Sequence, residues 1–286
     1  MRSFRKRLPA VRSDIFRDFT HITCFYTSSR LPHWQPIRLD NSGTPLVWHI
    51  SGLGTFYGDY PDIDLIFNKN NAALKVCVYS EDYFVGVTYV DMSGLELVRF
   101  APDFSQAINL TYLDISRNKF TENLANLYSL NSLQTLLCYS STLAGDFPDT
   151  RGAPVLEKLY LYNNDLANDI KYFNPTFVDF DVSDNLLITG TIPDASLAHN
   201  LQNFSVRNCR IDGITNFSNT LTTTNFDFRS NLLTVTEVDN LLHIMDTCLG
   251  YGSGKILLAP GDNAKPSAVG LTYKYSLVAK GWTVVT

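Results

Sequence analysis

The chain has 286 residues, of which 45% are hydrophobic and 18% are charged, with a formal net charge of −5. This composition is ample for a continuous buried core, and no stretch of it qualifies as a membrane span. The five cysteines lie far apart, without a CxxC or His/Cys cluster, which argues against a disulfide framework and a zinc site.

Residues 1–35 are predicted to form a basic N-terminal arm. Residues 1–20 contain six basic and two acidic side chains, a net charge of +4, so the remaining 266 residues sum to −9. A basic arm on an acidic body can bind nucleic acid or an acidic partner surface. A solvated chain end is the alternative. Charges interrupt every apolar run near the start, so we expect no signal peptide and no export by the usual route.

Residues 36–86 are predicted to form a small β-rich cap over the first repeat, or an attachment region. The runs PIRLD, PLVWHIS, IDLIF and LKVCVYS are short and β-type, and Gly, Asn, Asp and Pro separate them. This texture is typical of strands that are joined by turns.

Residues 87–235 contain seven copies of one pattern, with apolar residues at offsets 0, 3, 5 and 10 and Asn or another small polar residue at offset 8. The first copy is degenerate, with Leu95 at offset 8, and the last has Thr223 at offset 0. The copies begin at residues 87, 110, 133, 156, 177, 201 and 223, and their spacings lie between 21 and 24 residues. Such a period is the signature of a solenoid. The pattern assigns offset 10 of the fifth copy to Leu187. The cleanest copy consists of Leu156, Leu159, Leu161, Asn164 and Leu166.

The spacing of the pattern predicts which side chains are buried. Offsets 3 and 5 lie two residues apart, so on a short strand both face the core, while offsets 2, 4 and 6 face solvent. Cys138 and Cys209 fall on interior positions and are expected to be buried. The Asn at offset 8 turns the chain, and its amide can satisfy backbone groups of neighbouring coils. Stacked coils would pair their strands into a parallel sheet.

This pattern resembles the leucine-rich-repeat family over roughly residues 87–260. The resemblance implies an α/β solenoid, a leucine-rich-repeat stack with a parallel β-sheet face. LAGDFP (143–148) and ITGTIP (188–193) are similar to the L-x-G-x-I-P extension of plant-type repeats. That extension implies extended or 3₁₀ structure on the outer side of the stack rather than full helices.

Residues 236–286 are predicted to form a C-terminal cap that contains helices. Thr236 and Asp239 suggest the start of a first helix, whose apolar residues recur at helical spacing up to Gly250. GKILLAP predicts an eighth strand, and a second helix is expected from near Pro266 to before Gly281, followed by a short terminal strand. This segment resembles the C-terminal caps of repeat proteins encoded by Bacteroidota and by the phages that infect them.

The outward-facing offsets predict an exposed sheet face of the order of 35 Å, long enough for a standard interface. Its tyrosines can stack on sugars or peptides, although tyrosine and charge also simply suit the outer face of a sheet. The five histidines are scattered, without a nearby serine or cysteine motif, so we expect no enzyme, no cofactor and no metal site. The candidate ligand-binding residues are Tyr89, Tyr112, Tyr139, Tyr160, Tyr162, Asp179, Asp181, Arg207 and Arg229.

Two hypotheses for function follow from these features. The first is a non-enzymatic recognition protein, a phage virion or tail-associated component whose repeat face binds a protein or glycan on a host surface, or a neighbouring virion protein. The second is a structural or scaffolding virion subunit that uses its termini and edges. A cytoplasmic protein-interaction adaptor is a further alternative, because a fold does not dictate a function. The expected localisation is the virion, and otherwise the cytoplasm.

Overall fold

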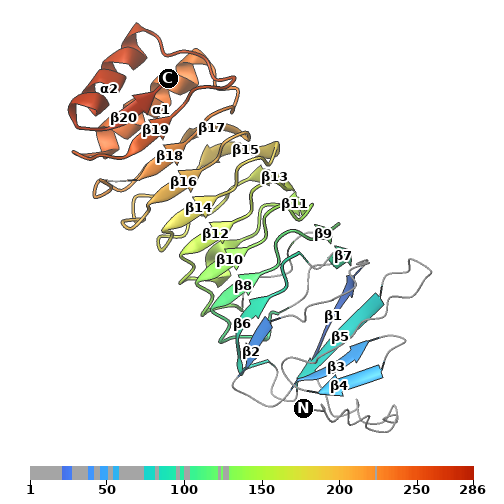
Figure 1. The fold of residues 1–286 in the computed structure, drawn as a ribbon. Helices are drawn as coiled ribbons and strands as arrows, with labels where there is room; N and C mark the ends of the chain where they lie inside the picture. Colours follow the sequence, from blue (N-terminus) through green and yellow to red (C-terminus); the bar gives the residue numbers. More distant parts are fainter. Residues whose placement is uncertain are drawn as a thin grey trace, which may run out of the picture.

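The predicted solenoid is confirmed by a computed structural model, in which successive coils stack along one axis (Figure 1). The structure describes residues 21–27, 38–41, 46–50, 54–57, 74–80, 84–94, 97–99, 104–121, 124, 129–222 and 224–286. The fold is a parallel β-solenoid with a long sheet on one side, a β-rich cap at the N-terminal end and a helix-containing cap at the C-terminal end.

The long side of the stack is a ten-stranded sheet to which each repeat contributes one short strand. Neighbouring strands pair in parallel, except that β2 runs antiparallel to β6 at one edge. The predicted eighth strand and terminal strand are present as β19 and β20. In sheet order the strands are β2 (Arg38–Asn41), β6 (Val87–Asp91), β8 (Tyr112–Asp114), β10 (Thr135–Leu137), β12 (Lys158–Tyr160), β14 (Asp179–Asp181), β16 (Asn203–Ser205), β18 (Asn225–Asp227), β19 (Lys255–Leu257) and β20 (Thr283–Val285).

The outer side of the stack is extended rather than helical, as the plant-type extensions imply. A second, four-stranded parallel sheet runs in the order β11-β13-β15-β17, and one 3₁₀ turn, Thr150–Gly152, lies between β11 and β12. The strands of this second sheet are β11 (Ala144–Asp146), β13 (Asp165–Asp169), β15 (Leu187–Ile192) and β17 (Arg210–Ile214).

The N-terminal cap is a six-stranded sheet in the order β4-β3-β5-β1-β7-β9. Its last two strands come from the outer side of the first two coils, which joins the cap to the solenoid (Figure 1). The sequence did not predict β1, which lies within the stretch assigned to the basic arm. Residues 1–20 and the run IDLIF lie outside the described residues. The strands are β1 (His21–Thr27), β3 (Val47–Ile50), β4 (Gly54–Tyr57), β5 (Leu74–Ser80), β7 (Leu97–Arg99) and β9 (Lys119–Phe120).

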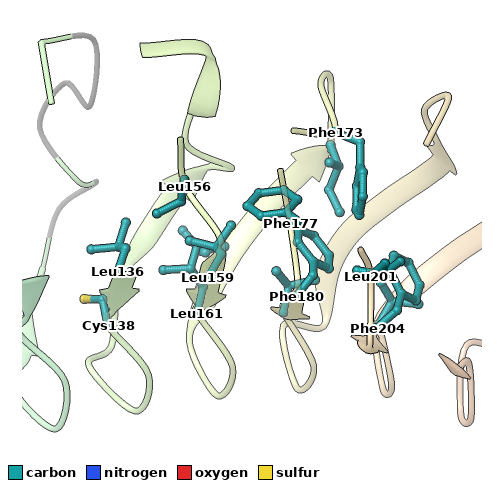
Figure 2. Packing of buried hydrophobic residues seen from close by; sticks show 14 of the residues in the cluster. Leu136, Cys138, Leu156, Leu159, Leu161, Phe173, Phe177, Phe180, Leu201 and Phe204 are labelled. Atoms are coloured by element: carbon teal, nitrogen blue, oxygen red, sulfur yellow. The ribbon is translucent and has the colours of Figure 1, made fainter. Parts of the chain in front are cut away.

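The core lies between the two sheets and follows the predicted offsets. Every residue at offsets 0, 3 and 5 is at most 4% exposed, apart from Thr223, which lies outside the described residues. Cys138 and Cys209 are both buried, as expected. Figure 2 shows leucines in the coils of Leu136 and Leu159, whereas the next two coils place phenylalanines, among them Phe180 and Phe204, in the core.

One core assignment is wrong. Leu187 is 53% exposed, and the next residue, Ile188, is fully buried in its place. In most coils the residue at offset 10 donates its N–H to the Asn side chain of the following coil. The coil after Leu187 has Cys209 at that position, and a thiol offers no amide oxygen. The chain closes a turn instead, in which Ile188 N–H donates to Asn185 O over 3.1 Å, and the register shifts by one residue.

The asparagines at offset 8 form a buried ladder along the stack, as predicted. Asn164 is typical. Its Oδ1 accepts N–H groups of the preceding coil, from Ser141 (2.9 Å) and Leu143 (3.0 Å), and its Nδ2 donates to Cys138 O (2.7 Å) and Leu161 O (2.8 Å). Each such amide therefore pairs backbone groups that the stack buries away from water. Asn118, Asn185 and Asn231 repeat the arrangement.

The C-terminal cap contains the two expected helices, α1 (Val235–Cys248) and α2 (Ala268–Ala279). The predicted start of α1 is wrong by two residues. Thr234 is the N-cap and forms a capping box with Glu237, whereas Asp239 accepts the N–H of Ser267 (2.9 Å), the N-cap of α2. In the described part of the chain, no helix is long and apolar enough to cross a bilayer.

Replacing Thr234 by alanine is expected to lower the free energy of unfolding by about 1 kcal/mol, because the N–H of Glu237 loses its partner at the helix start. Urea unfolding followed by circular dichroism measures this change. Thr236→Ala is the matched control, since this exposed threonine lies inside α1 and not at its cap. An equal loss for the two variants would contradict the assignment of the cap.

Candidate binding face

The candidate site is the solvent side of the ten-stranded sheet, where offsets 2, 4 and 6 of the repeats project; we call it the sheet face. Most of its side chains are half-buried by their neighbours on adjacent strands, which lie in register. The predicted exposure is wrong for four of them, which are buried: Asp114, Ser116, Asp179 and Ser183.

The five predicted tyrosines all lie on the sheet face, in two groups. In the first group, Tyr89 of β6 and Tyr112 of β8 stack with ring centres 4.4 Å apart and planes 2° from parallel. In the second group, Tyr139 and Tyr162 stack at 4.6 Å and 8°, and Tyr160 lies 6.5 Å from Tyr162. Because parallel strands bring equal offsets side by side, tyrosines at one offset stack along the axis of the solenoid.

These stacks leave little ring face for a ligand. Tyr139 has Tyr162 of the following coil on one side and the guanidinium of Arg117, from the preceding coil, 5.7 Å from its ring centre. The faces of Tyr89 and Tyr112 cover one another. Each stacked tyrosine therefore has one ring face covered by its neighbour, and Tyr139 has a guanidinium next to its ring as well, which leaves it the least ring face for a sugar.

Carboxylates surround the tyrosine hydroxyls and make their ionisation harder. Burial, followed by the nearby Asp179 carboxylate, raises the pKa of Tyr160 to about 12. Burial and the Asp114 carboxylate likewise raise the pKa of Tyr112. Both phenols are thus neutral hydrogen-bonding groups at neutral pH.

Asp179 does not behave as an exposed ligand-binding residue. It is 7% exposed, accepts a hydrogen bond from Asn203 Nδ2 (2.6 Å) and pairs with Lys158 Nζ (3.4 Å). These contacts tie together β12, β14 and β16. In the structure its contacts therefore join strands, and its predicted exposure is wrong, while its contact with a ligand stays a prediction.

The remaining predicted residues combine turn capping with ion pairing. Asp181 Oδ1 accepts the N–H and the hydroxyl of Ser183 (3.0 and 2.6 Å), which closes the turn after β14. Arg207 pairs with Asp184. Arg229 pairs with Asp227 over 2.6 Å, and both oxygens of that carboxylate are occupied. The two arginines are therefore held by acids of the protein itself.

An open depression of about 620 Å³ lies on the sheet face. Its floor and walls bring together five of the nine predicted residues. Tyr89, Tyr112, Asp179 and Arg229 are not part of its lining. The predicted residues that line it are Tyr139, Tyr160, Tyr162, Asp181 and Arg207, and Leu137 lies among them.

Sequence reasoning missed one contact between catalytic residue types. His199 Nδ1 lies 2.6 Å from Ser218 Oγ and 3.2 Å from Thr220 Oγ1. Ser218 is only 1% exposed, and its hydroxyl also contacts Thr220 Oγ1 at 2.9 Å. A nucleophile must reach its substrate, so this group reads as a network that ties neighbouring coils together. Among the described residues no group of His, Cys, Asp or Glu side chains could hold a metal ion.

No protein-family model and no curated protein matches the chain. Solved structures similar to it include a plant peptide hormone receptor, RGFR1, in complex with RGF2, with 17% identity and a TM-score of 0.49. The match covers 69% of this chain and 32% of the receptor chain. A plant ice-binding protein has 20% identity and a TM-score of 0.42, with 62% of this chain and 67% of that chain covered. An internalin from Listeria monocytogenes has 13% identity and a TM-score of 0.33, with 72% and 77% covered. Likenesses this distant carry no inference about what the chain binds.

Proposed function

We propose that this leucine-rich-repeat protein is a non-enzymatic recognition protein that binds a protein partner through the sheet face. The observation that carries the proposal is the tyrosine patch, defined as Leu137, Tyr139, Tyr160 and Tyr162, which lies in the depression. Half-buried tyrosines held rigid by stacking lose little conformational entropy on binding, and tyrosine is a common anchor of protein interfaces.

A protein partner is favoured over a glycan. Recognition of sugars by tyrosine relies on free ring faces, and the tyrosine stacks leave little free ring face, least of all at Tyr139. Hydroxyl groups at ring edges, next to a leucine, suit the mixed polar and apolar surface of a protein segment. A binding role is also favoured over catalysis, because the Ser218 hydroxyl next to His199 is buried and could not reach a substrate.

The finer proposal places the protein on a phage virion or tail, where it contacts a host surface or a neighbouring subunit. Its support is the resemblance of residues 236–286 to phage-encoded caps. A structural or scaffolding subunit is the second candidate, and the cap favours it because β20 forms one edge of the ten-stranded sheet. Deletion of residues 1–30 would abolish assembly in the scaffolding case, whereas substitutions on the sheet face would be harmless.

Replacing Tyr139, Tyr160 and Tyr162 together by alanine is expected to reduce partner capture more than about tenfold, because tyrosine anchors typically contribute about 2 kcal/mol each. The immobilised protein is incubated with host cells and with lysates of the source, and bound proteins are quantified by mass spectrometry. The control is triple alanine replacement of exposed tyrosines elsewhere, Tyr172, Tyr251 and Tyr275. If both triple variants capture the same set as the native chain, the sheet face is not the binding surface.

A further inference from the structure

The C-terminal end of the solenoid is formed by α2 on the outer side of the stack and by β20 on the sheet side (Figure 1). Among the described strands β20 pairs only with β19, and α2 packs against α1. Within the described residues no further coil covers these two elements. The last unit of a repeat stack normally presents a polar surface, because no neighbour buries it. This end departs from that rule in both of its elements.

The helix α2 has a second apolar stripe. One side of the helix is already in contact with α1: the ring centre of Tyr273 lies 4.7 Å from that of a histidine of α1, and Leu277 is fully buried. On another side lie Leu271, Tyr275 and Val278, whose spacing of four and three residues places them in one row. Tyr275 is 64% exposed and Val278 is 48% exposed. A surface helix usually has a single apolar stripe, so this row lacks a partner within the described residues.

The free edge of β20 offers backbone hydrogen-bonding groups. Thr283 N–H donates to Gly254 O (3.0 Å), and Val285 O accepts the N–H of Leu258 (2.8 Å), so Thr283 and Val285 face β19. Successive residues of a strand direct their backbone groups to opposite neighbours. The N–H and C=O of Val284 therefore point toward the open edge. Proteins usually protect such an edge with a charge, a proline or a covering element, and β20 contains neither a charge nor a proline.

This end of the molecule also carries almost no charge. Neither β20 nor the row on α2 contains a charged side chain. The one charged residue of α2 is Lys274, whose ammonium donates to Thr286 Oγ1 (2.8 Å). The chain as a whole has a net charge of −5, so two copies repel each other on average. A surface without charge can meet its own copy without bringing like charges together.

We propose that two copies of the chain join end to end through β20 and α2. A two-fold axis perpendicular to the sheet pairs the two β20 strands antiparallel, and the N–H of each Val284 donates to the C=O of the other. Such an axis keeps the outer layers of both copies on the same side of the joined sheet, so the apolar row of one α2 meets that of the other. One symmetry operation thus gives a partner to the strand edge and to the row. This surface is separate from the sheet face.

The first test is the oligomeric state of the full chain, which should sediment as a dimer. Val278→Lys is expected to weaken dimerisation more than about tenfold, because the symmetry brings two cations into one apolar contact. A cation near the C-terminal end of a helix is compatible with folding. Val269→Lys is the matched control, since Val269 is 58% exposed on a different side of α2. This control should change the dissociation constant less than about twofold.

Cysteine pairing tests the register independently of these variants. In the proposed pair Thr283 of one copy lies opposite Val285 of the other, and the Cα atoms of such a non-hydrogen-bonded pair are about 4.5 Å apart, within reach of a disulfide. Both side chains are exposed. A mixture of Thr283→Cys and Val285→Cys chains should therefore form a crosslinked dimer under mild oxidation. Either variant alone should crosslink much less, because identical positions are offset along the two strands.

Three results would overturn the proposal. A native chain that sediments as a monomer would leave the edge of β20 to a strand of a different protein. Species larger than a dimer would mean that the contact is not closed by a two-fold axis. Equal dimerisation of the two lysine variants, or equal crosslinking in the mixture and in the separate cysteine variants, would show that the copies meet through another surface.

Discussion

Replacing Asn164 by alanine is expected to lower the free energy of unfolding by about 3 kcal/mol or more. The side chain is buried and makes four hydrogen bonds to backbone groups: its Oδ1 accepts two, and its Nδ2 donates two. Alanine would leave these groups without partners between stacked coils, where leaving a buried polar group unsatisfied costs about 1–3 kcal/mol. Water entering the gap would recover a part of that cost, so the loss stays below the simple sum.

The change is measured by urea unfolding followed by circular dichroism, with Asn131→Ala as the control. Asn131 is exposed in a turn just before the copy that begins at residue 133, and it makes none of the hydrogen bonds described for the ladder. Its replacement should change stability by less than about 0.5 kcal/mol. If the two variants unfold at the same urea concentration, the buried amide does not hold adjacent coils together.

The ladder shows how far a repeat pattern predicts structure. The spacing of the apolar residues fixes which way each side chain points, because alternation on a strand is a local property. It therefore predicts the buried positions from Val87 to Leu233 almost without error. It fails at Leu187, where the neighbouring residue Ile188 takes the buried position instead. It also overlooks Asn263, which continues the ladder beyond the last repeat and accepts the N–H groups of Asn231 and Leu233 (2.9 and 3.2 Å).

The candidate site was predictable only as a set of residues that share a face. The offsets place Asp179 and Tyr160 on the same side of the sheet. They do not predict that the Asp179 carboxylate forms an ion pair with Lys158 and accepts a hydrogen bond from Asn203. Pairing depends on the register between coils more than 20 residues apart and on side-chain conformations. For the same reason the sequence could not reveal that Arg117 covers Tyr139, or that His199 meets Ser218.

Replacing Phe204 by alanine is expected to destabilise the protein by about 3–5 kcal/mol, the largest effect of any single change proposed for this chain. The ring is 1% exposed, and its centre lies between 5.3 and 6.1 Å from those of five other phenylalanines. The cluster spans the three strands β14, β16 and β18, so little backbone movement could close the cavity. Phe147→Ala is the control, because this ring is only partly buried and contacts the cluster through Phe180 alone, at 6.3 Å. The Phe147→Ala variant should lose less than half as much free energy of unfolding as Phe204→Ala.

The location of the damage matters as much as its size. In a solenoid each coil contacts only its neighbours, so a defect in one coil weakens the adjacent interfaces before it affects distant ones. Hydrogen exchange of the Phe204→Ala variant should therefore accelerate first in β14, β16 and β18, while β5 and the N-terminal sheet keep their protection. Uniform acceleration over all described strands would mean that the chain unfolds as one cooperative unit. In that case the phenylalanine cluster would stabilise the N-terminal cap as strongly as the coils that contain it.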